Sequence, residues 1–403
     1  MELNPHVTVL GLTFLIALVI GVVANKTNFC TMGGVSDWIN IGDTGRFRSW
    51  VFAMGVAMLG VGALQATGTI QLDNQVFPPY RSSNLMWLRN LIGGFMFGVG
   101  MTLASGCGNK TLVRVGGGNL KSLVVLAIAA FFAYMMLWGE DPFAPGEGFF
   151  SNYFMSWIQP TVIDLSRFGL DDQGLGYVFG GLLGVENPEG LQNIVALVIG
   201  VGLLVFAFVS RHFRDSFDNI LGGAVIGVAI IAAWWITAGA LGDVWKEWAA
   251  FAETPPARVA SQSYTFISAM GDSVRYLRDL TDLSLISFGL MALTGVIIGS
   301  FMWAIFTGRF RVEWFRTSAD LMRHVWGGIL LGVGGVLSMG CTIGQGITGV
   351  STLAIGSAIA LSAIVLGSAF TLKMQYYLLD EGWGAAFRKT LSDLRILPSP
   401  REA

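Results

Sequence analysis

The hydrophobic residues of this chain gather in long uninterrupted runs, not in alternating or one-sided patterns. Runs of roughly 17 to 25 apolar residues have the length that a helix needs to cross a bilayer. We therefore predict about nine transmembrane helices, joined by polar segments. They are expected at Val7–Ala24, Trp50–Gly68, Leu88–Ser105, Leu120–Gly139, Leu191–Ser210, Ile220–Ala240, Leu285–Phe306, His324–Gly340 and Ala354–Leu372.

Four further segments are too short to cross the bilayer and contain Gly, Ser, Thr or Asn. Irregular backbone persists at membrane depth only where protein or a water-filled cavity covers it. We predict that these segments are re-entrant or broken half-helices. They are Asn28–Ile39, Gly108–Gly118, Ser263–Leu277 and Thr342–Thr352.

Composition supports a membrane protein and argues against a nucleic-acid partner. The 403 residues are 53% hydrophobic and only 12% charged, whereas soluble domains carry about 25% charged residues. The net charge is −2, and the chain has no basic tract beyond short loop clusters of Lys and Arg. We therefore expect membrane lipid around this protein and no nucleic acid bound to it.

The distribution of charge predicts an orientation. Basic clusters fall in alternate connections, whereas the long segment Glu140–Glu189 is mostly acidic. Cytoplasmic loops of membrane proteins are enriched in Lys and Arg. We therefore predict a multi-pass membrane protein with its N-terminus outside and its C-terminus in the cytoplasm.

A glycine-rich segment occurs twice and ends both times in Gly-Cys. The copies, Arg89–Cys107 and Arg323–Cys341, align without a gap and are identical at nine of nineteen positions. Five predicted spans separate their starts, so the copies must cross the membrane in opposite directions. This predicts an inverted repeat around a central constricted pathway. We expect Arg89 and Arg323 to be snorkelling anchors at the entrances of their spans, with a role in a vestibule of the pathway as the alternative.

The repeat divides the chain into five predicted regions. A linking span and an extracytoplasmic insertion separate two halves of four spans each, and a cytoplasmic tail follows. The regions are 1–140, the first half; 141–190, the insertion; 191–219, the linking span; 220–373, the inverted second half; and 374–403, the tail.

The three cysteines, Cys30, Cys107 and Cys341, each follow a predicted span and open a half-helix. A helix N-terminus presents free backbone N–H groups and the positive end of a dipole. Glycine allows a ligand to approach those groups, so the pattern predicts an anion site without Arg or Lys. The supporting contacts predicted beside the cysteines are Asn28, Thr31, Gly106, Gly108, Asn109, Gly340, Thr342 and Gln345.

Other interpretations of the cysteines stay open at this point. A free Cys in a membrane commonly packs as a small hydrophobe. Thiol–disulfide exchange with a partner is a second alternative, although there is no C-x-x-C pair and the cysteines lie far apart in sequence. Transport of a soft metal is a third, although the three histidines form no metal-binding spacing. The sequence indicates no resident metal, no cofactor and no catalytic residue.

The residues quoted above resemble the YeeE/YedE family of bacterial inner-membrane proteins, which carry thiosulfate or related sulfur-containing ions. The most specific matches are the second-half motif G-C-T-I-G-Q-G and the setting N-F-C-T-M-G-G around Cys30. Ser261–Leu277 resembles the family's second-half counterpart of the Cys30 region but carries no cysteine. The resemblance implies that Cys30, Cys107 and Cys341 contact the passing ion. It also implies a cytoplasmic TusA-like sulfur-carrier protein as a partner, and selenium compounds remain an alternative cargo.

These observations lead to a transport hypothesis. Thiosulfate is a dianion with one soft terminal sulfur, and the protein must replace its water in the membrane. Half-helix N–H groups meet the oxygens, while un-ionised thiols contact the sulfur in a relay of S–H···S contacts. Weak contacts at several sites let an ion enter and leave. We predict that Cys341→Ser impairs uptake more than Cys107→Ser does.

Overall fold

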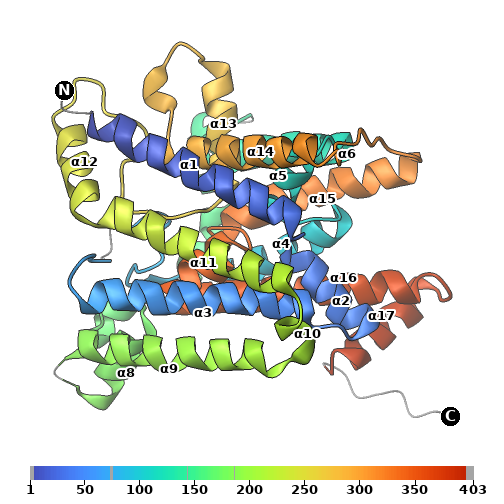
Figure 1. The fold of residues 1–403 in the computed structure, drawn as a ribbon, viewed down its shortest axis with the longest axis horizontal. Helices are drawn as coiled ribbons and strands as arrows, with labels where there is room; N and C mark the ends of the chain where they lie inside the picture. The colour runs from blue at the N-terminus through green and yellow to red at the C-terminus, as the bar shows by residue number, and fades with distance from the viewer. Residues whose placement is uncertain (1–3, 73–75, 143, 186, 396–403) are drawn as a thin grey trace.

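The computed structural model describes residues 4–72, 76–142, 144–185 and 187–395. Long helices dominate the fold, and the strands are short (Figure 1). The long helices are α1 (Pro5–Lys26), α3 (Gly45–Ala66), α4 (Trp87–Leu103), α6 (Leu120–Trp138), α9 (Pro188–Val209), α11 (Phe217–Ala238), α14 (Phe288–Phe306), α15 (Ser318–Leu337) and α16 (Ile355–Tyr377).

The expected all-α membrane architecture is confirmed. Within the described residues, eight helices are long and apolar enough to cross a membrane, and all eight coincide with predicted spans. The ninth predicted span corresponds to α15, which has 20 residues but begins with the polar turn around Asp320 and Arg323. Charged residues in that first turn lower its hydropathy without shortening the helix.

The four predicted half-helices are present. They are α2 (Thr31–Ile41), α5 (Gly108–Gly116), α13 (Ile267–Arg278) and η5 (Gly344–Gly349), the last a π-type turn that continues toward Val350. Each begins shortly after a short non-helical connection, and all four have buried residues at their N-terminal ends. Protein therefore covers the broken backbone, as the membrane interior requires.

The helices pack in pairs that match when the two halves of the chain are exchanged. Helix α1 packs on α14 as α3 packs on α11, and α4 packs on α16 as α15 packs on α6. The half-helices follow the same rule, because α2 contacts α16 as α13 contacts α6. This is the arrangement expected of an inverted repeat.

The two copies of the glycine-rich segment cross at the centre of this arrangement. A methyl group on Gly93 of α4 would come within 2.4 Å of the Ser338 nitrogen, and one on Gly327 of α15 within 2.6 Å of the Ala104 nitrogen. The start of α4 therefore lies beside the end of α15, and the end of α4 lies nearer the start of α15. The copies run in opposite directions, as the sequence predicts.

Several shorter elements have no counterpart in the sequence prediction. Helix α12 (Ala240–Ala250) follows α11, and α17 (Trp383–Asp393) packs on α16. The remaining helices are α7 (Ser156–Ile158), α8 (Leu175–Leu183) and α10 (Arg211–Arg214), with turns η1 (Ser151–Met155), η2 (Gln159–Thr161), η3 (Leu165–Phe168) and η4 (Leu283–Leu285). Strands β1 (Asn84–Leu85) and β4 (Ile163–Asp164) pair, as do β2 (Glu140–Asp141) and β3 (Ala144–Gly148).

The ends of the molecule carry different short elements. Helix α12 and the start of α1 lie at one end of the long helices, whereas α2 and α17 lie at the other (Figure 1). Helix α9 lies along α3 at the edge of the bundle, with α8 beside it. The largest cluster of buried hydrophobic residues lies between the two halves and contains all three cysteines.

Candidate functional site

Each cysteine stands two residues after a residue in the left-handed backbone region. Asn28, Ser105 and Met339 have φ values of 53°, 58° and 59°. The turns at Ser105 and Met339 also close alike, because Gly106 N–H donates to Met101 O and Gly340 N–H donates to Gly335 O. Side chains other than glycine are strained in this region, and such strain concentrates at functional sites. A residue in the left-handed region therefore stands between two helices at all three cysteines, and the closing hydrogen bond is shared by the turns before Cys107 and Cys341.

Cys30 and Cys107 are the N-cap residues of α2 and α5, and Cys341 lies just before η5. The Cys30 sulfur accepts a hydrogen bond from Gly33 N–H at 3.4 Å, and the Cys341 sulfur accepts one from Gly344 N–H at 3.4 Å. Cys107 caps α5 without a side-chain bond of this kind. The fourth half-helix, α13, has Phe266 at this position. Sulfur is a weak acceptor, so these caps leave the half-helix ends less satisfied than Ser or Asp would.

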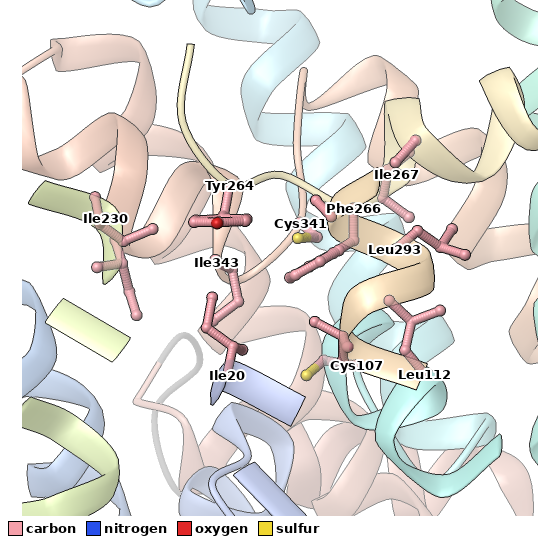
Figure 2. Packing of buried hydrophobic residues seen from close by; sticks show 14 of the residues in the cluster. Ile20, Cys107, Leu112, Ile230, Tyr264, Phe266, Ile267, Leu293, Cys341 and Ile343 are labelled. Carbon is pink, nitrogen blue, oxygen red and sulfur yellow. The ribbon is translucent and has the colours of Figure 1, made fainter. Parts of the chain in front are cut away.

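The three thiols lie in one buried cluster. Cys30, Cys107 and Cys341 are 6%, 1% and 0% exposed and are not disulfide-bonded. The side chains of Cys30 and Cys107 interact with each other. Figure 2 shows Cys341 beside Phe266, with the sulfur atoms of Cys341 and Cys107 pointing toward the side on which Ile343 lies.

Residues at the half-helix starts join the cysteines across the two halves. The Thr342 side chain lies against the Cys107 thiol. A methyl group on Gly108 would lie 3.7 Å from Cys341 Cβ. Gly108 and Thr342 occupy the same position in the two copies, so these contacts are related by the repeat. Four half-helix N-termini thus meet around three thiols.

Buried polar atoms without hydrogen-bond partners surround the thiols. Among the described residues, the Thr31 hydroxyl, both amide atoms of Asn109 and the Gln345 carbonyl oxygen are unpartnered. The Thr342 hydroxyl also has no conventional partner and approaches only a thiol. Nearly all buried polar side chains in proteins are hydrogen-bonded, and each exception calls for an explanation. All four residues were predicted from the sequence as supporting contacts, and their spare donors and acceptors suit a polar ligand.

The structure places the other predicted contacts around this centre. Gly106 and Gly340 form the turns before their cysteines, and Gly108, which follows Cys107, lies close to Cys341. Asn28 is exposed, and its side-chain oxygen accepts a hydrogen bond from Lys110 Nζ at 3.1 Å. Asn28 therefore lies at the rim and not beside the thiols.

Sequence reasoning missed three residues at the site. Phe266 is fully buried, and Thr265 precedes it at the start of α13. The Tyr80 hydroxyl lies beside Thr265 and would come within 3.3 Å of a methyl group on Gly344. The second-half counterpart of the Cys30 region pointed to Thr265 and Phe266. Tyr80 lies in a loop without repeat or motif, so nothing in the sequence marked it.

Two hollows open near opposite ends of α4. The Lys110 mouth has a volume of about 310 Å³ and is lined by Asn25, Asn28, Lys110, Val113, Arg114, Gly117, Asn119, Arg309, Arg311 and Glu313. The Arg89 mouth has a volume of about 120 Å³ and is lined by Phe77, Pro78, Pro79, Arg89, Leu137, Thr265, Ile267, Ser268, Gly335, Val336, Met339 and Gly340. The first adjoins the turn before Cys30 and the half-helix after Cys107, and the second adjoins the turn before Cys341.

The sequence profile of the sulphur transport family matches residues 26–370, which include the three cysteines and the four half-helices. The chain belongs to this family. The resemblance to YeeE/YedE proteins is thereby confirmed, and the relatives below are named as transporters, in agreement with a protein that is not an enzyme.

Two relatives extend over nearly the whole chain. A thiosulfate transporter TsuA of Spirochaeta thermophila is 25% identical over 358 residues, covering 88% of this chain and 95% of that protein. A thiosulfate transporter TsuA of Escherichia coli K12 is 24% identical over 365 residues, covering 86% of this chain and 89% of that protein. This chain is therefore a multi-pass membrane protein of a transport family that handles sulfur compounds.

Proposed function

We propose that this protein takes up thiosulfate, or a closely related sulfur-containing ion, through a relay of its three cysteines. The main support is the buried cluster in which three free thiols meet four half-helix N-termini. The printed names of the two relatives support thiosulfate as the cargo.

The chemistry of the cluster suits such an ion. The half-helix N–H groups and the unpartnered side chains of Asn109 and Thr31 offer hydrogen bonds to the sulfonate oxygens. The thiols offer polarizable, weakly donating partners to the terminal sulfur. Lys110 and Arg46 act electrostatically on the Cys30 thiol. The contacts offered by the thiols and the half-helix ends are individually weak, so the ion is released again.

The positions of the two mouths suggest an order of contacts. The Arg89 mouth contains Gly340 and Thr265 and leads to Cys341. The Lys110 mouth adjoins the turn before Cys30 and the half-helix after Cys107. We infer that the ion meets Cys341 first and the adjacent pair Cys107 and Cys30 afterwards. In the orientation predicted from charge, this direction is uptake into the cytoplasm.

The proposal retains the finer sequence predictions. It includes an inner-membrane location, the five-region division of the chain, and a TusA-like sulfur carrier as an acceptor at the Lys110 mouth. Co-purification of the tagged protein with such a carrier, with and without the substitution Arg311→Glu, tests the last point. Retention of the carrier by the wild-type protein alone supports it.

Uptake of labelled thiosulfate into proteoliposomes tests the relay. Cys341→Ser is expected to impair uptake more than Cys107→Ser, because Cys107 has Cys30 as a neighbouring thiol whereas Cys341 stands alone on its side. Ser keeps the size and a donor but loses the softness of sulfur. Normal uptake by a variant with all three cysteines replaced would refute the relay.

Two controls separate the alternative functions. A thiol–disulfide oxidoreductase would lose and regain two titratable thiols in each cycle, whereas a transporter keeps three during uptake. Competition by selenium oxyanions and by soft metal ions, measured in the same proteoliposomes, tests the alternative cargoes. Stronger competition by either than by unlabelled thiosulfate would replace thiosulfate in the proposal.

A further inference from the structure

Arg89 does not extend toward the surface as a snorkelling anchor. Its Nε donates to Leu337 O at 2.8 Å and its Nη2 to Val336 O at 2.9 Å, at the end of α15. Its Nη1 contacts Met86 Sδ at 3.3 Å, and the guanidinium lies 5.0 Å from the centre of the Phe150 ring. Among the described residues, no carboxylate pairs with it. The expectation of a snorkelling anchor was therefore wrong for Arg89, whereas the alternative of a vestibule role stays open.

The guanidinium lines the Arg89 mouth, and it is the only charged group among the lining residues. Most of the other lining side chains are apolar, with Thr265 and Ser268 as exceptions. A cation with apolar walls and no counter-ion produces a strong local field, because little water screens it. The position is next to Gly340, which directly precedes Cys341.

The repeat mate of Arg89 provides an internal comparison. Arg323 stands at the same position of the second copy but is exposed, and it forms no hydrogen bond or ion pair within the described chain. It lines a different hollow, together with Leu103 and Lys373. Packing of the two copies therefore does not require a guanidinium at a helix end. The contact of Arg89 with the end of α15 is found only at the Arg89 mouth.

We propose that Arg89 is the residue that selects oxyanions at the Arg89 mouth, binding sulfonate-type oxygens before the soft sulfur reaches Cys341. This inference rests on the proposed transport function and names an additional residue for it. Weak, buried thiols cannot draw a dianion out of water, whereas a planar guanidinium binds two oxygens at once. The two carbonyls of α15 occupy part of its donor capacity, so it holds the ion without trapping it.

The proposal separates recognition of charge from recognition of sulfur. Sulfate shares the charge and the oxygens of thiosulfate but has no soft terminal sulfur. It should therefore compete at the Arg89 mouth and fail to proceed along the thiols. Sulfate is thus expected to inhibit thiosulfate uptake competitively and to be taken up slowly or not at all.

The test is the concentration dependence of thiosulfate uptake in proteoliposomes. Arg89→Gln is expected to raise KM about tenfold or more, with kcat changed less than about twofold, because one charge-assisted contact is lost. Arg89→Lys keeps the charge but not the planar guanidinium, so its KM should lie between those of the wild-type protein and Arg89→Gln. Arg323→Gln, the matched control, should leave KM unchanged. Inhibition by sulfate should weaken in parallel with the rise in KM for Arg89→Gln.

The outcomes distinguish the two levels of the proposal. If the wild-type protein shows no thiosulfate uptake, the transport function fails and not this inference alone. If uptake is normal but sulfate does not inhibit it, or Arg89→Gln keeps both KM and sulfate inhibition, Arg89 does not select anions. If Arg89 has a purely structural role, Arg89→Gln should lower kcat and the yield of folded protein while KM stays constant. Should Arg89→Gln fail to fold, Arg89→Lys gives the decisive KM.

Discussion

The amide of Asn109 illustrates at the residue scale how the site combines instability with function. Asn109 is 1% exposed, and neither of its amide atoms has a partner in the described chain. Leaving a buried donor or acceptor unpaired costs about 1 to 3 kcal/mol. Such a residue weakens the folded protein unless a ligand completes its hydrogen bonds. The same argument applies to Thr31 and Gln345, which lie beside the other two cysteines.

Replacing Asn109 with Leu separates these two effects. Asn109→Leu removes the unpaired atoms while keeping the branched shape of the side chain, so the apparent melting temperature in detergent should rise. Thiosulfate uptake should fall about tenfold or more, since a donor and an acceptor for the ion are lost. Thermal unfolding and uptake by the same preparation measure both quantities.

A matched control lies elsewhere in the membrane core. Asn90 of α4 is also 1% exposed, and both its amide atoms are unpartnered within the described residues. Its side chain lies against Gly356 of α16. Asn90→Leu should also raise the melting temperature, but uptake should remain normal. Equal loss of uptake in the two variants would show that Asn109 has no special contact with the ion.

The sequence predicted most residues of the site for an identifiable reason. The chain has only three cysteines, each at a break between apolar segments, and the repeat relates two of them. Tyr80, which the prediction missed, lacks such signals because it reaches the site from a loop. Arg89 was named, but its features favoured an ordinary span-end anchor over a vestibule role. Only tertiary packing brings Tyr80 to Thr265 and Arg89 to the end of α15.

At the scale of the elements, glycines determine how closely the two repeat helices approach. A methyl group on Gly334 would come within 2.6 Å of the Phe97 nitrogen, and one on Gly93 would meet the backbone of Ser338 at 2.4 Å. Small residues allow this approach between membrane helices. The crossing positions the turns that lead to Cys107 and Cys341, so the spacing of the thiols depends on it.

Gly334→Ala is therefore expected to damage both stability and transport. The added methyl group collides with backbone and forces α15 away from α4, at a cost of about 1 to 3 kcal/mol. Melting temperature and uptake should both fall. Gly202→Ala on α9 is the control, because none of the described residues lies within 4 Å of the added atom. Equal melting temperatures and equal uptake for the two variants would show that the close crossing of α4 and α15 matters neither for stability nor for transport.

The accuracy of the element prediction follows from how each element is stabilised. The spans and half-helices were predicted because long apolar runs and glycine-rich breaks are local properties of the sequence. Helix α12 was missed because Asp243 and Glu247 interrupt its apolar pattern. Its buried Trp245 donates to His6 Nδ1 at 3.0 Å, so contact with α1 stabilises it. A tertiary contact of this kind leaves no periodic signal.

At the scale of the whole molecule, the inverted repeat produces a site that is only partly symmetric. The exchanged helix pairs make the framework of the two halves alike. The site itself carries Cys30 at the start of α2 and Phe266 at the start of α13. One side of the centre therefore has two thiols and the other has one. The mouths differ as well, because four basic residues and Glu313 line one whereas a single Arg lines the other.

This asymmetry gives the pathway a direction that labelling can test. The charge distribution predicts that the Arg89 mouth faces outward and the Lys110 mouth faces the cytoplasm. Ser268→Cys places a thiol in the first mouth, and Arg311→Cys places one in the second. A membrane-impermeant thiol reagent should therefore label Ser268→Cys in intact cells and Arg311→Cys only in inverted vesicles. The native cysteines, at most 6% exposed, should give a low background in both preparations. Labelling of both variants from the same face would mean that the mouths do not open on opposite sides, and a single passage through the thiol cluster would then be untenable.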